Sequence, residues 1–376
     1  MSRAVYLDYN ATAPIRPEAA AAVTRALEWV GNASSVHRFG RLARRTVEDA
    51  REAVAALVGA RPAQVVFTGG GTESNNMALR GAGRARVLVS AGEHVSVLDA
   101  VESAEHIPLT SDGLVDIESL AGLLAADERP ALFSVMLANN ETGVIQPVAE
   151  VASLARAHGA LVHCDAVQGA GRVPLDMAAL GVDMLSLSAH KLCGPQGVGA
   201  LVLGEGVEPA PLLRGGGQER RRRAGTENVA GIAGFGAAAE VAADALDDSS
   251  RLADLRDDLE RRVRALAPEA VVFGSGVPRL ANTSCLAVPG WPAETQVMGL
   301  DLAGVAVSAG SACSSGKVSP SHVLRAMGVD DAGAGGAIRV SLGWASEAPD
   351  VDRFVEAWSA LYSRRAARAH ADSPAA

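Results

Sequence analysis

Lysine is nearly absent from this 376-residue chain. Its 34 basic residues comprise 32 arginines and only two lysines, Lys191 and Lys317. Arginine does not deprotonate in proteins and forms no Schiff base, so a retained lysine indicates a position that requires an amine. Lys191 follows the apolar run 183–187 and stands in a turn rich in serine, histidine and glycine. This pattern predicts a buried strand that ends near a lysine able to condense with an aldehyde, and the alternative is a surface lysine on a loop.

Cysteine is also scarce, and no C-x-x-C pair occurs. The four cysteines are Cys164, Cys193, Cys285 and Cys313. Their wide spacing indicates neither a zinc site nor a disulfide framework. The first three lie in or beside apolar strand sequences, which favours buried thiols. Cys313 is surrounded only by small residues, in a stretch that predicts a flexible loop able to move a sulfur atom between two places.

Long apolar runs are missing as well. No run approaches the ~18 residues that a membrane span needs, and the N-terminus shows no signal or transit pattern. The net charge of −9 argues against nucleic acid as a direct partner. We therefore expect a cytoplasmic protein that binds neither membrane nor nucleic acid. The basic run 220–223 is expected to be solvated, although 224–226 forms a second loop suited to phosphate.

No internal repeat is present, and strand and helix patterns alternate between residues 64 and 203. Such alternation predicts an α/β fold with a mostly parallel sheet that binds ligands at the carboxyl ends of its strands. A helical connector is expected over 229–266. Shorter strands beyond it, between 271 and 341, predict a smaller α+β domain, and the tail after Leu361 is expected to fray.

A glycine-rich turn at 68–72 stands between a predicted strand and a predicted helix. Backbone N–H groups and a helix N-terminus in such a turn favour a phosphate. The turn does not fit G-x-G-x-x-G, because residue 74 is serine, and no G-x-x-x-x-G-K-[ST] motif occurs. A small phosphate ester is therefore expected rather than a dinucleotide or a nucleoside triphosphate. The alternative is a glycine-rich turn without a ligand.

An acidic residue, Asp165, ends another predicted strand 26 residues before Lys191. A carboxylate in this position is the partner that a pyridinium nitrogen needs, although a lone aspartate after a strand is more often a helix N-cap. His94 by itself is interpreted as a histidine at a helix start. The coincidence of acid, lysine and glycine turn strengthens the case for a cofactor.

These features together resemble the cysteine desulfurases of the NifS/IscS type, which belong to the class V aminotransferase family. The resemblance runs from residue 6 to about residue 343. The motifs that carry it are GGGTESNN at 69–76, GEHVSVLD at 92–99, ANNETGV at 138–144, HCDAVQ at 163–168, SLSAHKLCGP at 186–195, AGTEN at 224–228 and SAGSACSSG at 308–316.

The resemblance implies the fold type I of pyridoxal-phosphate enzymes. Its large domain, expected over 15–254, would hold a mostly parallel seven-stranded sheet. A smaller α+β domain would combine 1–14 with 255–376 and would carry the Cys313 loop. The implied cofactor is pyridoxal 5'-phosphate, bound covalently by Lys191.

Site roles also follow from the resemblance. Asp165 would pair with the ring nitrogen, Gln168 would reach the phenolic oxygen, and His94 would stack on the ring and assist proton transfer. The remaining implied cofactor contacts are Gly71, Thr72, Asn140, Ser188, His190 and, from the other subunit of a homodimer, Thr226. Asn32, Asn140 and Arg339 would orient the substrate, with Arg339 on its carboxylate.

The implied reaction converts L-cysteine to L-alanine and leaves a persulfide on Cys313. The persulfide would serve a sulfur-acceptor protein, either an iron–sulfur scaffold or a thiolation enzyme, and Cys313 could then act as a transient iron–sulfur ligand. Two alternatives stay open. One is another class V aminotransferase or a selenocysteine lyase, and the other is a sulfur carrier or scaffold with an inactive site.

Overall fold

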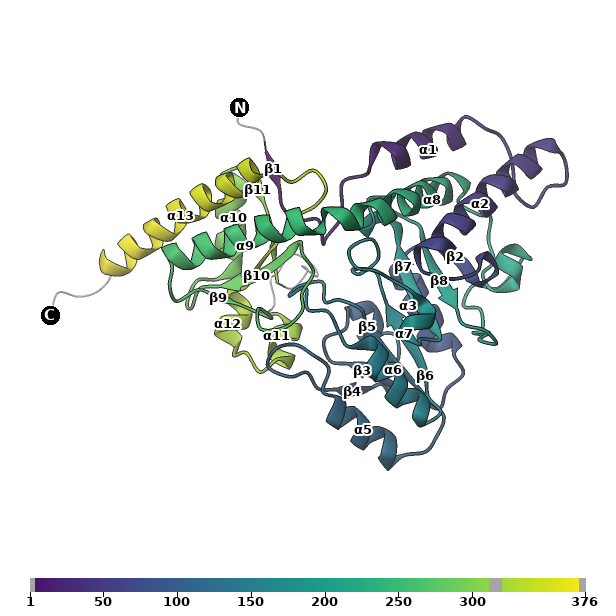
Figure 1. Ribbon diagram of the computed structural model, residues 1–376, viewed down its shortest axis with the longest axis horizontal. Helices are drawn as coiled ribbons and strands as arrows, with labels where there is room; N and C mark the ends of the chain where they lie inside the picture. The colour runs from purple at the N-terminus through teal and green to yellow at the C-terminus, as the bar shows by residue number, and fades with distance from the viewer. Residues whose placement is uncertain (1–3, 311–319, 372–376) are drawn as a thin grey trace.

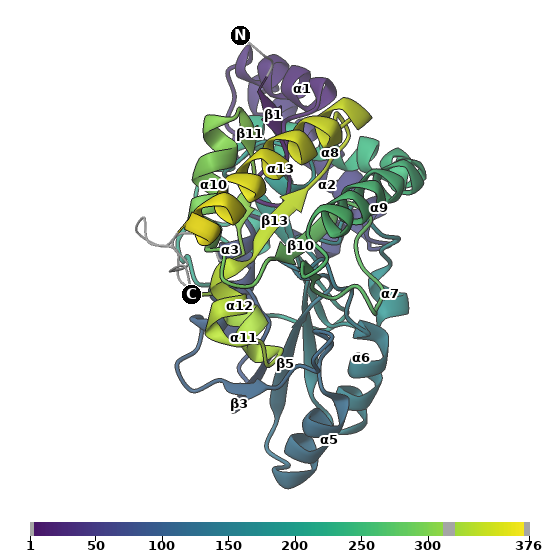
Figure 2. The same cartoon turned by 90° about the vertical axis from the view of Figure 1, so that its left-hand side faces the viewer.

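The computed structural model describes residues 4–310 and 320–371 of the chain. Figures 1 and 2 show two α/β parts joined by one long helical connection, with the β1 strand lying in the smaller part. Each part has its own buried apolar core. The chain therefore forms two units, and its N-terminal segment passes from the smaller to the larger.

The larger part is built on a seven-stranded sheet. Its strands are β2 (Val65–Thr68), β3 (Arg86–Ser90), β4 (Glu105–Ile107), β5 (Ala131–Met136), β6 (Leu161–Asp165), β7 (Met184–Ser188) and β8 (Gly199–Leu203). The spatial order is β2-β8-β7-β6-β5-β3-β4. All neighbours pair in parallel except β8, which is antiparallel to both β2 and β7. The predicted mostly parallel seven-stranded sheet is confirmed.

Helices cover both faces of this sheet. They are α1 (Pro17–Leu27), α2 (Arg38–Leu57), α3 (Gly71–Gly81), α4 (Val95–Leu98), α5 (Ile117–Ala126), α6 (Val148–Ala157), α7 (Met177–Leu180) and α8 (Val229–Asp244). Short 3-10 turns lie at η1 (Pro62–Gln64), η2 (Ala189–Lys191), η3 (Gln218–Arg221) and η4 (Ala245–Asp248). Local signals set the starts of several helices: Pro17 opens α1, and the carboxylate of Asp116 caps α5.

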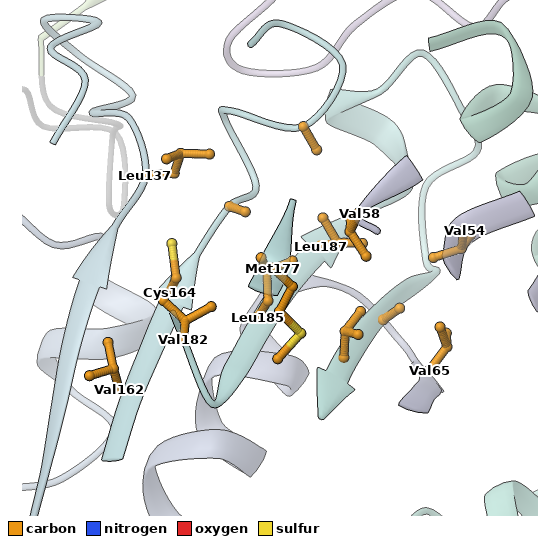
Figure 3. Packing of buried hydrophobic residues seen from close by; sticks show 14 of the residues in the cluster. Val54, Val58, Val65, Leu137, Val162, Cys164, Met177, Val182, Leu185 and Leu187 are labelled. Atoms are coloured by element: carbon orange, nitrogen blue, oxygen red, sulfur yellow. The ribbon is translucent and has the colours of Figure 1, made fainter. Parts of the chain in front are cut away.

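Successive side chains of a strand point to opposite faces of the sheet and pack into two different cores. Leu185 and Leu187 of β7 point to the side of α2, α5, α6 and α8, whereas Met184 of the same strand packs with α3. Figure 3 shows part of the first core, with Val58, the residue that follows α2, beside Leu187 of β7. Because both faces are covered, ligands can reach this sheet only at the strand ends.

The smaller part contains a four-stranded antiparallel sheet of order β12-β13-β10-β9 and the parallel pair β1-β11. Its strands are β1 (Val5–Tyr6), β9 (Val271–Val272), β10 (Thr283–Ala287), β11 (Val305–Ala306), β12 (Ser308–Ala309) and β13 (Ile338–Ser341). Its helices are α9 (Ser249–Leu266), α10 (Ala293–Leu302), α11 (His322–Ala326), α12 (Asp331–Gly336) and α13 (Ala348–Ala371). The expected boundary at 254/255 falls inside α9.

One expectation about the helices needs correction. The tail after Leu361 does not fray at once, because α13 continues to Ala371. The helical connector predicted over 229–266 is present and consists of α8, η4 and α9. No single helix in 4–310 and 320–371 is both long and apolar enough to cross a membrane, and only the bent pair Val229–Ala242 and Leu246–Leu266 passes that test when taken together. α8 itself is packed between α1 and α2 (Figure 1).

Candidate active site

A cavity of about 310 Å³ opens where the parallel strands of the large sheet end. β6 ends on Asp165 and its neighbour β7 ends on Ser188, which is followed by the η2 turn that carries Lys191. Ten predicted site residues line this cavity: Gly71, Thr72, His94, Asn140, Asp165, Gln168, Ser188, His190, Lys191 and Arg339. The structure therefore brings together most of the predicted site.

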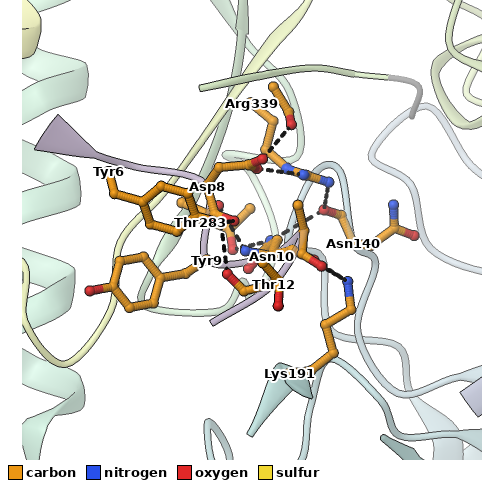
Figure 4. A network of polar contacts seen from close by, with 12 residues as sticks. Tyr6, Asp8, Tyr9, Asn10, Thr12, Asn140, Lys191, Thr283 and Arg339 are labelled. Carbon is orange, nitrogen blue, oxygen red and sulfur yellow. Dashed lines mark hydrogen bonds and ion pairs between the residues drawn. The ribbon is translucent and has the colours of Figure 1, made fainter. Parts of the chain in front are cut away.

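The amine of Lys191 points toward the N-terminal segment that crosses between the two parts. Its Nζ donates to the backbone oxygens of Asn10 and, at 2.7 Å, of Ala11 (Figure 4). Burial lowers the pKa of Lys191 to about 7, and the guanidinium groups of Arg339 and Arg172 add to this effect. A substantial fraction of this lysine is thus neutral near pH 7, as a nucleophilic amine must be.

The carboxylate of Asp165 is fixed from two sides at the bottom of the cavity. Its Oδ2 accepts from Asn75 Nδ2 at 2.7 Å, and its Oδ1 accepts from the backbone N–H of Val167 at 3.0 Å. The Asn75 amide also donates to Ser96 Oγ at 2.9 Å. These bonds hold the carboxylate in place for a cationic partner inside the cavity.

The glycine-rich turn forms a cradle at the N-terminus of the eleven-residue helix α3. Gly70 has φ of 147°, a value that favours glycine. A Cβ on Gly71 would lie 2.9 Å from Val167 Cγ2, so the wall leaves no room for a side chain there. Thr72, Ser188 and His190 border the same space. The N–H groups in the first turn of a helix, the nearby hydroxyls and the helix dipole together suit a phosphate group.

His94 occupies the N-cap position of α4, as its sequence context suggested. Its Nδ1 accepts from the backbone N–H of Ser96 at 3.1 Å and lies 2.8 Å from Ser96 Oγ. Burial lowers the pKa of His94, and the nearby Lys191 acts in the same direction against the opposing charge of Asp165. A neutral imidazole is therefore presented to the cavity, which it lines.

Arg339 of β13 brings a positive charge to the cavity from the smaller part. One terminal nitrogen donates to Asp8 Oδ1 at 2.8 Å and the other to the backbone oxygen of Asn140 at 3.0 Å (Figure 4). Within the described part of the chain, its buried Nε has no hydrogen-bond partner. The guanidinium is thus held in a fixed orientation and keeps donor capacity for an anion.

Three predicted site residues are not part of this cavity. Asn32 and Thr226 are exposed and line no part of it. Cys313 lies outside the described residues. Ser308, which precedes Cys313 by five residues, does line the cavity, and its hydroxyl donates to Asp8 Oδ2 at 2.8 Å. The chain that leads to Cys313 therefore starts at the cavity wall.

The sequence did not single out Asn10, which has a central place in the site. Its backbone oxygen accepts from Lys191 Nζ and from Gln168 Nε2, and its amide donates to Thr283 Oγ1 at 2.9 Å. Asn75 and Ser96 were also missed. Asn75 lies three residues after Thr72 on α3, so one turn of the predicted helix would have placed both on the same face.

Metal ligands are not grouped in the described residues. In 4–310 and 320–371, no cluster of three or more His, Cys, Asp or Glu side chains could hold a metal ion. Burial raises the pKa values of the thiols of Cys164 and Cys285 well above the ordinary value. Both are unreactive as thiolates.

Known proteins are similar to this chain in sequence and in fold over almost its entire length. The profile of the Aminotransferase class-V family matches residues 5–354. The chain belongs to this family. A cysteine desulfurase of Cereibacter sphaeroides is 47% identical over 367 residues, which are 94% of this chain and 94% of that protein.

Solved structures of this family agree with the present fold. A NifS-like protein from Rickettsia africae superposes with a TM-score of 0.90 at 34% identity, and covers 96% of this chain and 100% of its own. The structure described as SspA in complex with cysteine has a TM-score of 0.77 at 27% identity, and covers 90% of this chain and 98% of its own.

The family is dependent on pyridoxal 5'-phosphate, and the cavity fits this group. Lys191 offers an amine of lowered pKa for the aldehyde. Asp165 offers a fixed carboxylate for the ring nitrogen, and the cradle at Gly70 and Gly71 offers a space for the phosphate that a side chain would fill. The prediction of this cofactor is therefore confirmed at the level of the family.

Proposed function

We propose that this protein is a cysteine desulfurase, which converts L-cysteine to L-alanine and retains the sulfur on Cys313 as a persulfide. The name of the Cereibacter relative, at 47% identity over nearly the whole chain, supports this activity. A family member with cysteine in its structure supports the same substrate.

One observation carries the proposal. The cavity that contains Lys191, Asp165 and Arg339 is also lined by Ser308, five residues before Cys313. Five extended residues span at most about 17 Å. A tether of this length allows the thiol of Cys313 to reach a substrate that is bound in this cavity.

Residues of the cavity are proposed either to bind the substrate carboxylate or to transfer protons. Arg339 and Asn140 lie together and are proposed to hold the α-carboxylate of the substrate. Pyridoxal phosphate supplies an electron sink for negative charge at the substrate Cα. Lys191, with its pKa lowered to about 7, can accept the Cα proton. His94 presents a neutral imidazole for further proton transfer.

The sulfur step is a displacement that balances without an outside oxidant. The thiolate of Cys313 attacks the substrate sulfur, a sulfur–sulfur bond forms, and the bond between the substrate sulfur and Cβ breaks. The electron pair of that bond stays with carbon, where a proton completes L-alanine. Both sulfur atoms end more oxidised, and the substrate carbon ends more reduced.

Peptide mass spectrometry tests the proposal directly. Purified protein without reductant is exposed to L-cysteine, and the peptide that carries Cys313 is expected to gain one sulfur atom. The gain should be absent in Lys191→Ala and in Cys313→Ser. Bound cofactor without any added sulfur would contradict the proposal and favour an aminotransferase or lyase.

The proposal extends to a homodimer. Apolar side chains are exposed where α1 ends and α2 begins, with Val30 83% and Val36 87% exposed beside Trp29 and Phe39. Burial of these groups against a second copy would stabilise a dimer. Thr226, exposed in the single chain, would then be free to reach the phosphate of a second copy. Light scattering of the purified protein tests this dimer.

We also propose that the persulfide serves an acceptor protein in the cytoplasm, either an iron–sulfur scaffold or a thiolation enzyme. A persulfide on Cys313 gives the sulfur in a transferable form, because thiolates exchange at disulfide-type bonds. Incubation of persulfurated protein with candidate acceptors, followed by mass spectrometry of each acceptor, tests this part.

A further inference from the structure

Gly310 and Ser321, two residues that flank the part of the chain with Cys313, form a narrow neck. The backbone N–H of Gly310 donates to Ala337 at 2.9 Å and that of Ser321 to Ala334 at 3.3 Å. A Cβ on Gly310 would lie 3.5 Å from Cβ of Ser321. Gly310 and Ser321 therefore lie side by side.

Glu141 lies directly at this neck, although it comes from the larger part of the protein. Its Oε2 accepts from Ser321 Oγ at 2.5 Å and would lie 3.3 Å from a Cβ on Gly310. The residue is only 2% exposed. The carboxyl group of Glu141 thus bonds to Ser321 and lies beside Gly310.

No ion pair among the described residues compensates for the burial of the Glu141 carboxyl group. Among the described residues, it forms no salt bridge. Burial raises the pKa of Glu141 to about 7, against the opposing effects of the Ser321 hydrogen bond and of the Arg339 charge. Burial of an unpaired acid is costly, so its position at the neck calls for a functional reason.

A second contact joins the same neck to the larger part. His322, the residue after Ser321, lies with its Nε2 at 2.9 Å from the backbone oxygen of Glu93. Figure 2 shows α11, which begins at His322, beside the sheet of the larger part. Glu93 directly precedes His94, and Glu141 directly follows Asn140. Both contacts therefore end on residues adjacent in sequence to residues that line the cofactor cavity.

We propose that Glu141 is a positioning residue for sulfur transfer: through its bond to Ser321 it joins the neck, where the Cys313 segment begins and ends, to the loop that supplies Asn140. It thereby fixes where this segment starts and ends relative to the cavity. The inference rests on the proposed desulfurase function. Glu141 does not touch the reacting atoms in this account and acts through the neck.

The test compares Glu141→Ala, Glu141→Gln and Ser321→Ala in the cofactor-loaded protein. Rapid quenching and peptide mass spectrometry give the rate at which sulfur from L-cysteine reaches Cys313. The change in cofactor absorbance with added L-alanine gives the affinity of the cavity for an amino acid without sulfur. Thermal unfolding gives the stability of each variant.

Glu141→Ala is expected to slow sulfur arrival at Cys313 by about 10- to 100-fold, as misplacement by about 1 Å does in other enzymes. Binding of L-alanine should stay within about twofold of wild type, because the cavity itself is intact. Ser321→Ala should slow the same step, whereas Glu141→Gln, which keeps an acceptor for Ser321, should recover most of the rate.

Asp116→Ala is the matched control. It removes the same kind of contact, a carboxylate that accepts from the hydroxyl of Ser119 at 2.8 Å, but it does so on α5. Its sulfur-transfer rate should equal that of wild type. Normal sulfur transfer in both Glu141→Ala and Ser321→Ala would overturn the inference, as would equal losses of L-alanine binding and of sulfur transfer. Failure of the wild type to gain sulfur on Cys313 would instead overturn the proposed function.

Discussion

Arg51 and Glu219 form a two-pronged ion pair in the interior of the larger part. Terminal nitrogens of Arg51 donate to the two carboxylate oxygens of Glu219 at 2.7 and 2.8 Å, and the side chains are 7% and 4% exposed. Glu219 also accepts from the backbone N–H of Phe67 at 2.9 Å. This pair ties the loop before the predicted phosphate segment 224–226 to helix α2 and strand β2.

Replacement of Arg51 by methionine is expected to lower the free energy of unfolding by about 3–5 kcal/mol, because a buried carboxylate then loses its partner. Urea unfolding of the purified variant measures this change. Arg45→Met is the control on the same helix, since Arg45 is 80% exposed and 3.7 Å from Asp49. Similar losses in the two variants would contradict the assigned importance of the buried pair.

Arg221→Gly is expected to stabilise the protein. Glu219, Arg220 and Arg221 have φ values of 44°, 58° and 69°, so three consecutive residues adopt a conformation that favours glycine. Arg221 is exposed. Relief of strain, less the added entropy of glycine in the unfolded chain, predicts a gain of up to about 1 kcal/mol.

Urea unfolding checks this gain as well. Glu52→Gly, at an exposed position in the interior of α2, should have the opposite sign and cost about 1 kcal/mol. A loss of stability in Arg221→Gly would show that the loop does not store strain at this residue.

The cofactor-free protein is expected to become more stable as the pH rises from about 7 toward 10.5, relative to Lys191→Met. The pKa of Lys191 is lowered from 10.5 to about 7 in the folded state. In this range the unfolded chain binds a proton that the folded chain has released, so the free energy of unfolding increases with pH. Unfolding curves at pH 7, 8 and 9 test this difference, and parallel pH profiles for the two proteins would contradict it.

Gly71→Ala is expected to weaken the binding of pyridoxal phosphate about tenfold or more. The added Cβ would lie 2.9 Å from Val167 Cγ2, so the cradle must widen. Titration of cofactor-free protein with pyridoxal phosphate, followed by absorbance, gives the affinity. The control is Gly122→Ala on α5, where a Cβ would meet no atom within 4 Å. That variant should bind the cofactor normally, and a normal affinity in Gly71→Ala as well would contradict a tight cradle.

Local patterns in the sequence were sufficient for most of the large sheet. The alternation of strand and helix patterns over 64–203 predicted this sheet, and the apolar run 183–187 agrees with β7 (Met184–Ser188) to within one residue, because β7 is buried on both faces. Shorter strands had weaker signals. β12 has two residues and β4 three, too few for a periodic pattern, and neither was predicted.

In the site as well, residues next to a strand pattern could be predicted, whereas residues defined by contacts distant in sequence could not. Lys191 and Asp165 could be found because each follows a strand pattern. Asn10 could not, because its contacts are with Gln168, Lys191 and Thr283, more than 150 residues away. No local pattern reveals such a contact. The basic run 220–223 was expected to be solvated, yet Arg223 pairs with Glu73 at 2.8 Å, again through distant residues.

The location of Asn10 has a consequence for how the protein is made on the ribosome. The carbonyl groups that receive Lys191 belong to residues 10 and 11, and the guanidinium that lines the same pocket belongs to residue 339. A nascent chain can form the large sheet once residue 203 has emerged, because all seven strands are then available. The pocket around the lysine closes only near the end of synthesis. A nascent chain that already holds its sheet is therefore still without a complete cofactor pocket.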